Sequence, residues 1–128
     1  ESARLAAVRA NEPDVKAVLA ALDARAETGA PGRRRRSLDA EFHRLIAAAA
    51  RNPVHAVVTH ALTALQSNVV GGRPDLTAED DAAIVTAHRA IYEAIVGHDP
   101  EAARAAMHAH VIDIEQRLGR VGVERAAS

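Results

Sequence analysis

Seven histidines are the side chains best suited to chemistry in this 128-residue sequence, which contains no cysteine. Asp39 and His43 lie four residues apart. On a helix this spacing puts both side chains on one face, with their Cβ atoms about 5–6 Å apart. Their neighbours Phe42 and Ile46 are apolar, so we expect this face to point into a core. The pair is therefore a candidate metal-binding site, and an aspartate–histidine contact at the surface is the simpler alternative.

Two further histidines are expected to point inward from neighbouring helices. His88 lies on an apolar stripe between Ile84 and Ile91. His110 falls on the apolar face of the following helix, whereas His108, only two residues away, falls on its polar side. A single inward histidine is more often a core residue that forms a hydrogen bond with a neighbour than a metal ligand. The two positions therefore have to be considered together.

The turn between these two helices places both imidazoles at the same level. His88 is nine residues before Gly97, and His110 is ten residues after Pro100. At a rise of ~1.5 Å per residue, each histidine lies ~14–15 Å from the turn. An antiparallel helix pair therefore brings the two rings to one height, where the Asp39–His43 pair of a third helix could join them.

Together these residues form a typical donor set for a transition metal. Three imidazoles and one carboxylate suit Zn²⁺ first, with Ni²⁺, Mn²⁺ and Fe²⁺ as alternatives. Without a metal, burying so many titratable groups would be costly. The proposed ligands are Asp39, His43, His88 and His110. The remaining histidines are expected to face solvent, namely His55, His60, His98 and His108.

The composition predicts that helices position these residues. About a quarter of the chain is alanine, and Phe42 and Tyr92 are its only aromatic residues, which favours helices over strands. Turn signals at 11–14, 29–32, 52–53, 71–74 and 97–100 divide the sequence into six helical stretches. Short loops between helices predict an all-α, antiparallel bundle. We expect one domain over residues 1–119 and a frayed tail over 120–128.

Charge and hydropathy exclude several kinds of function for this segment. The net charge of −1 argues against a broad nucleic-acid-binding surface. The run Arg33 to Arg36 is expected to be a solvated loop before a helix capped by Ser37. No apolar run approaches the roughly 18 residues of a membrane span. The chain opens within a helical pattern and without methionine, so we expect further residues upstream.

Three short motifs follow one another along the chain. They are DAEFH at 39–43 with AAARNP at 48–53, AHRAIYEAI at 87–95, and DPEAARAAMHAH at 99–110. Their order and spacing resemble the FCD domain, the C-terminal effector domain of FadR-type regulators in the GntR family. The segments 1–7 and 14–22 also fit the start of that domain, so the resemblance covers roughly residues 1–119.

The resemblance implies a metal in the central cavity of a helical bundle. Its ligands would be the same four residues, Asp39, His43, His88 and His110. The implied effector is a small carboxylic acid that coordinates the metal and alters DNA binding by an N-terminal winged helix-turn-helix domain absent from this sequence. The family usually dimerises, and a cytoplasmic location is expected. Candidate effector contacts are Arg44, Thr63 and Gln66.

Two other functions would use the same residues. A metalloenzyme could activate water at three histidines and one aspartate, but it would also need a base, and the inward faces offer no spare glutamate. A metal-free helical module for interaction or dimerisation would simply pack its histidines in the core. We expect the sensing domain rather than an enzyme.

Overall fold

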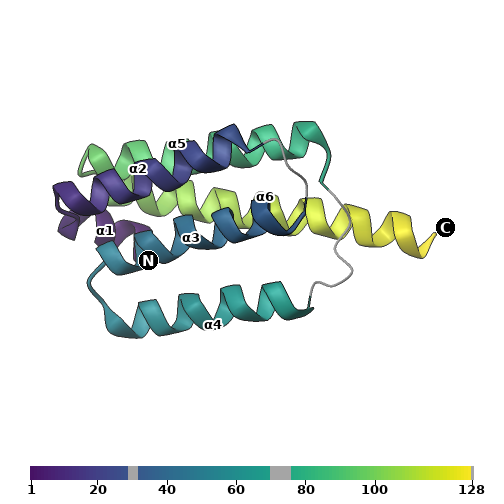
Figure 1. Ribbon diagram of the computed structural model, residues 1–128, viewed down its shortest axis with the longest axis horizontal. Helices are drawn as coiled ribbons and strands as arrows, with labels where there is room; N and C mark the ends of the chain where they lie inside the picture. Colours follow the sequence, from purple (N-terminus) through teal and green to yellow (C-terminus); the bar gives the residue numbers. More distant parts are fainter. Residues whose placement is uncertain (29–31, 70–75, 128) are drawn as a thin grey trace.

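The computed structural model is an all-helical bundle and describes residues 1–28, 32–69 and 76–127, without the side chains of 66–69 and 120–126. The described part contains six helices and no strand, which confirms the predicted fold class. Consecutive long helices run antiparallel (Figure 1). The helices are α1 (Ser2–Arg9), α2 (Glu12–Glu27), α3 (Arg33–Ala49), α4 (Pro53–Val69), α5 (Ala78–Val96) and α6 (Pro100–Ala126).

Side-chain caps define where two of the helices begin. Asn11 precedes α2 and accepts a hydrogen bond from the backbone N–H of Asp14, whose carboxylate accepts one from the N–H of Asn11. Thr77 and Asp80 form the same reciprocal box at the start of α5. These caps satisfy backbone donors that a helix start leaves unpaired.

Helix α3 begins earlier than the sequence predicts. Its N-cap is Gly32, with a φ of 83°, and the helix starts at Arg33 rather than after Ser37. The prediction that Arg33 to Arg36 form a loop is therefore wrong. Arginine is a good helix former, and no glycine or proline separates the run from the helix that follows it.

The core lies where α1, α2, α3, α5 and α6 meet, and α1 contributes to it through alanines. Ala3, Ala6 and Ala7 are fully buried, whereas the larger Val8 is 61% exposed. Small side chains let α1 approach its neighbours closely, and it contacts α3, α5 and α6. The larger core residues are Val18, Leu22, Phe42, Ile46, Ile91 and Ile95.

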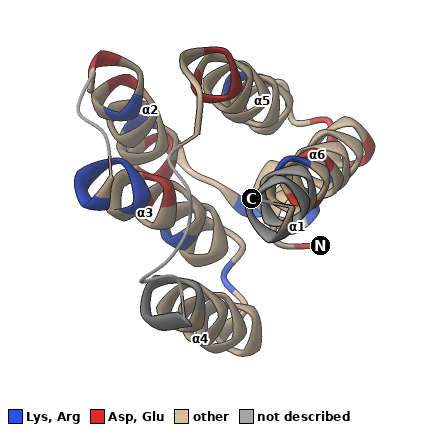
Figure 2. Ribbon diagram, turned by 90° about the vertical axis from the view of Figure 1, so that its right-hand side faces the viewer, with Lys and Arg blue, Asp and Glu red and all other residues tan. Residues whose placement is uncertain are grey.

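Helix α4 lies at the edge of the bundle and packs mainly against α3 (Figures 1 and 2). The aliphatic side chains of its stripe are not buried but remain 50–69% exposed. Figure 2 shows no charged residue on this helix, and its sequence contains none. The exposed aliphatic residues are Val54, Val57, Val58, Leu62 and Leu65.

Helix α6 continues past Gly119, where the sequence predicts its end, and runs to Ala126. Its C-terminal part projects beyond the other helices (Figure 1). Among the described residues, no helix combines the length and the apolar character needed to cross a membrane.

Candidate metal centre

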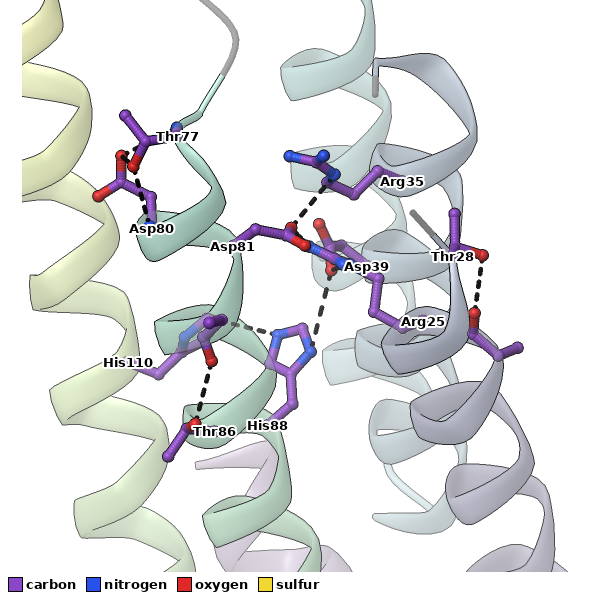
Figure 3. Close-up of polar contacts among 12 residues, drawn as sticks. Arg25, Thr28, Arg35, Asp39, Thr77, Asp80, Asp81, Thr86, His88 and His110 are labelled. Atoms are coloured by element: carbon purple, nitrogen blue, oxygen red, sulfur yellow. Dashed lines mark hydrogen bonds and ion pairs between the residues drawn. The ribbon is translucent and has the colours of Figure 1, made fainter. Parts of the chain in front are cut away.

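Three histidines from three helices meet in the bundle. His43 on α3, His88 on α5 and His110 on α6 each offer one ring nitrogen, and these atoms lie within 4.8 Å of one another. The Nε2 atoms of His88 and His110 are 3.2 Å apart (Figure 3). The equal distances of these two residues from the α5–α6 turn, inferred from the sequence, agree with this contact.

Packing fixes the orientation of the rings. His88 is completely buried, His110 is 5% exposed and His43 is half-buried. The ring of His88 stacks on Phe42, with centroids 4.2 Å apart and an interplanar angle of 16°. The ring of His43 lies 5.3 Å from that of His110. Contacts with core residues and with one another therefore fix the orientation of the imidazoles.

Burial keeps these imidazoles neutral. It lowers the pKa of His43 to about 4, with a smaller contribution from nearby His110. Burial also lowers the pKa of His88 and His110. The Nδ1 atoms of His88 and His110 are buried, and neither has a hydrogen-bond partner among the described residues. Neutral, converging imidazoles with unsatisfied polar atoms fit the ligand chemistry of a divalent transition metal.

Asp39 lies beside the three histidines, but Arg25 holds its carboxylate. Its Oδ1 accepts a hydrogen bond of 2.6 Å from Nε of Arg25 and lies 3.9 Å from Nδ1 of His88 (Figure 3). The latter distance is too long for a hydrogen bond. Burial raises the pKa of Asp39, although Arg25 partly opposes this shift. The structure thus places the predicted carboxylate next to the cluster, outside the group of three ring nitrogens.

Arg25 links three helices behind the histidines. Its side chain is completely buried, and its guanidinium on α2 donates hydrogen bonds to Asp39 on α3 and to Asp81 on α5. Nε of Arg35 lies 3.1 Å from Oδ1 of the same Asp81. Burial alone would lower the pKa of Arg25, but the bonds to Asp81 and Asp39 raise it above its usual value. Two cations and two anions therefore compensate one another here.

A cavity of about 680 Å³ borders the cluster. It lies between α3, α4, α5 and α6, next to the start of α1, and the four predicted metal ligands line it. The α4 and α6 walls are largely aliphatic, with Val58, Leu62 and Ile114 among their residues. A mostly apolar cavity with a few converging polar groups is typical of a small-molecule site.

The three predicted effector contacts differ in where they lie relative to the cavity. Thr63 lines the cavity, and its hydroxyl donates to the backbone carbonyls of Thr59 and His60. Arg44 is exposed and forms an ion pair with Glu41, and it is not among the cavity-lining residues. The side chain of Gln66 lies outside the described residues.

The other histidines are only partly as expected. His60 and His108 are exposed, in agreement with the prediction. His55 is half-buried at the cavity, with its Nδ1 3.1 Å from the hydroxyl oxygen of Ser2. His98 is exposed, but its Nδ1 lies 2.9 Å from the carbonyl oxygen of Ala7 and so connects the α5–α6 turn to α1.

The buried ion pairs of Arg25 were not predicted, although the spacing of the residues contains a signal for them. Arg25 continues the apolar stripe of Val18 and Leu22 at helical spacing, and Asp81 lies three residues before Ile84 on the stripe of His88. An arginine and an aspartate on inward faces predict mutual pairing. The Ser2–His55 contact, by contrast, joins residues 53 apart and has no local signal.

The family model of the FCD domain matches residues 1–113 of the chain. The match includes the three clustered histidines and Asp39. No curated protein sequence matches the chain.

Proposed function

The chain belongs to the FCD domain family, and from this premise we propose that it is the metal-containing, effector-sensing domain of a GntR-family transcriptional regulator. The observation that carries the proposal is the convergence of three buried or half-buried histidines, whose ring nitrogens lie within 4.8 Å of one another. The Nε2 atoms of His88 and His110 support it, because at 3.2 Å apart both can reach one ion at zinc–nitrogen distances of about 2.0–2.1 Å.

His43, His88 and His110 would hold the ion, with Asp39 as the proposed fourth ligand. We propose zinc first, because three neutral imidazoles and a carboxylate suit it, with nickel, manganese and iron as alternatives. When bound, such an ion supplies a positively charged contact for a carboxylate of the effector. The apolar walls of the cavity would exclude water from this contact. Thr63 on α4 remains a proposed polar contact from the cavity wall, and Gln66 remains a proposed effector contact.

The effector would act by favouring one packing of the helices over another. A ligand that joins the metal to α4 shifts an equilibrium between two arrangements by its difference in affinity for them. In the proposed regulator this shift reaches DNA through a winged helix-turn-helix domain, and the helical bundle itself needs no basic surface. Such a mechanism requires no nucleophile and no proton transfer, so we propose a sensor rather than an enzyme, located in the cytoplasm.

We propose that the domain forms a homodimer, and α4 is the surface that supports this. Its aliphatic side chains are exposed, and the helix carries no lysine, arginine, aspartate or glutamate. An apolar, uncharged face is expected to be covered, and two copies of it meet without charge repulsion.

Metal content tests the central proposal. The chain is purified without a histidine tag, supplied with zinc, dialysed and subjected to elemental analysis, with one zinc per chain expected. His110→Ala should weaken zinc binding at least tenfold, whereas His108→Ala, an exposed position two residues away, should leave it unchanged.

A second variant, His43→Gln, and the far-UV circular dichroism of all variants separate loss of metal from loss of fold. A folded wild-type chain that retains no zinc would contradict the proposal, as would equal effects of His110→Ala and His108→Ala. Thermal shifts with small carboxylic acids, before and after chelation, then test the link between metal and effector. Identical shifts in both states would argue against effector binding at the metal.

A further inference from the structure

The arginines that line the cavity differ in how well they are neutralised. Arg117 pairs with both Asp80 and Asp113, and Arg35 shares Asp81 with Arg25. Arg36 lines the cavity and has no ion pair among the described residues. It is only half-exposed, although free arginines are usually well solvated. The cavity therefore presents one uncompensated guanidinium.

Arg36 and the histidine cluster lie on the same face of α3. Arg36, Ala40 and His43 all line the cavity and are separated by four and three residues, the spacing of one helical face. Seven residues of helix separate Arg36 from His43, which corresponds to ~10 Å along the axis. Besides the paired Arg35 and Asp39, the cavity face of α3 thus carries a histidine at one level and, about two turns away, a cation that is unpaired among the described residues.

The charges around the cluster also call for an anionic ligand. Arg25 and Arg35 are balanced by Asp39 and Asp81, and imidazole ligands are neutral. Asp80 and Asp113, the latter near His110, share Arg117 and leave one negative charge, so the described residues would compensate only part of the two positive charges that a divalent ion adds. Glu115 lines the cavity from α6 but is exposed to solvent. A ligand with a single carboxylate at the metal would leave the charge of Arg36 unpaired.

We propose that Arg36 forms a second, cationic subsite and that the effector is a dicarboxylate, with one carboxylate at the histidine cluster and the other paired with Arg36. The inference rests on the proposed function, since it takes the metal at the histidines as the first contact. A charge-assisted pair between guanidinium and carboxylate in a partly dry cavity is strong enough to decide between ligands of equal length.

The test compares succinate with butyrate, two four-carbon acids that differ in one carboxylate, by calorimetric titration of the zinc-loaded chain. The wild type should bind succinate about tenfold more tightly than butyrate. Arg36→Gln should weaken succinate binding about tenfold and change butyrate binding less than about twofold. Arg34→Gln is the matched control, because Arg34 is exposed on the same turn of α3, and it should change neither affinity.

The outcomes separate the two proposals. If Arg36→Gln keeps the preference for succinate, or if Arg34→Gln loses it equally, the subsite is wrong while carboxylate sensing stands. If butyrate and succinate bind with equal affinity to the wild type, the dicarboxylate assignment is overturned in the same way. If neither acid, nor glutarate as a longer dicarboxylate, binds to the zinc-loaded chain, the proposed sensing function fails and the subsite fails with it.

Discussion

The three imidazoles of the cluster are held in the form that binds metals. Burial is the main cause, since it lowers the pKa of His43 to about 4 and also lowers those of His88 and His110. A neutral imidazole has a free lone pair at pH 7, so metal binding there would release no protons from these rings. These neutral imidazoles therefore make the pocket suitable for a metal cation, although it contains few anionic side chains.

The same pKa shifts predict that acid destabilises the metal-free chain. When the pKa of a histidine is lower in the folded chain than in the unfolded chain, its contribution to stability is fully present above the unfolded pKa of about 6.5. That contribution is lost as the pH falls from about 6.5 towards the folded value, about 4 for His43, because the unfolded chain binds more protons in this range. Each buried histidine can contribute at most about 1.4 kcal/mol per pH unit.

Urea unfolding of the chelated chain between pH 7.5 and pH 4.5 measures this dependence. His88→Leu removes one of the shifted groups and should reduce the slope of stability against pH, whereas the exposed His108→Ala should retain it. The ionisable neighbours of the rings, Arg25, Asp39 and Asp113, are present in both variants. A stability that stays constant over this range would refute the prediction.

At the scale of the helices, one buried arginine holds three elements in register. Arg25 on α2 reaches Asp39 on α3 and Asp81 on α5, and α2 packs against both helices. This network orders the helix that carries Asp39 and His43 relative to the one that carries His88. The hydrogen bond from Arg25 also holds the carboxylate of Asp39 beside the histidines, so this network affects the residue that we propose as the fourth metal ligand.

Removing this arginine should be far more costly than removing a surface one. Arg25→Met leaves Asp39 and Asp81 without their buried partner, and we expect a loss of about 3 kcal/mol in the free energy of unfolding. Arg89→Met breaks a comparable α5–α2 pair with Asp23, which is exposed and 3.5 Å long, and should cost less than about 1 kcal/mol. Equal losses for the two variants in urea denaturation would show that the buried network adds nothing specific.

At the scale of the whole molecule, α4 is the part that the bundle leaves uncovered. Its contact with α3 leaves Val57 69% exposed and Leu65 58% exposed. Neither residue lines the cavity, so an effector in the cavity would not cover them. A second copy packed on this face would bury them and would place the two cavities near a shared interface.

The self-association prediction can be tested with a single charge. Val57→Glu places a carboxylate in the centre of the proposed interface and should convert a dimer into a monomer, because pairing would then bury two like charges. Ala90→Glu introduces the same charge at an exposed position of α5 and should leave the dimer intact. Light scattering coupled to size exclusion gives the mass, and a monomeric wild type or dissociation by both variants would contradict the prediction.

Local pattern was sufficient for much of this molecule. The break around Gly97 and the inward positions of His88 and His110 follow from the sequence, because each depends on turn residues or on periodicity within one helix. The all-α class follows from the same signals. The start of α3 was missed because Ser37 offered an equally good local cap within a run of helix formers.

Only the tertiary structure decided what these helices present to one another. It pairs Arg25 with Asp39 and Asp81, sets Arg36 on the cavity, joins Ser2 to His55 and leaves the aliphatic face of α4 exposed. Periodicity determines which side of a helix is apolar, but the partner of that side depends on how distant helices pack. Residues far apart in sequence meet only through this packing. The proposed ligands, their charged partners and the cavity walls are therefore brought together only by the tertiary structure.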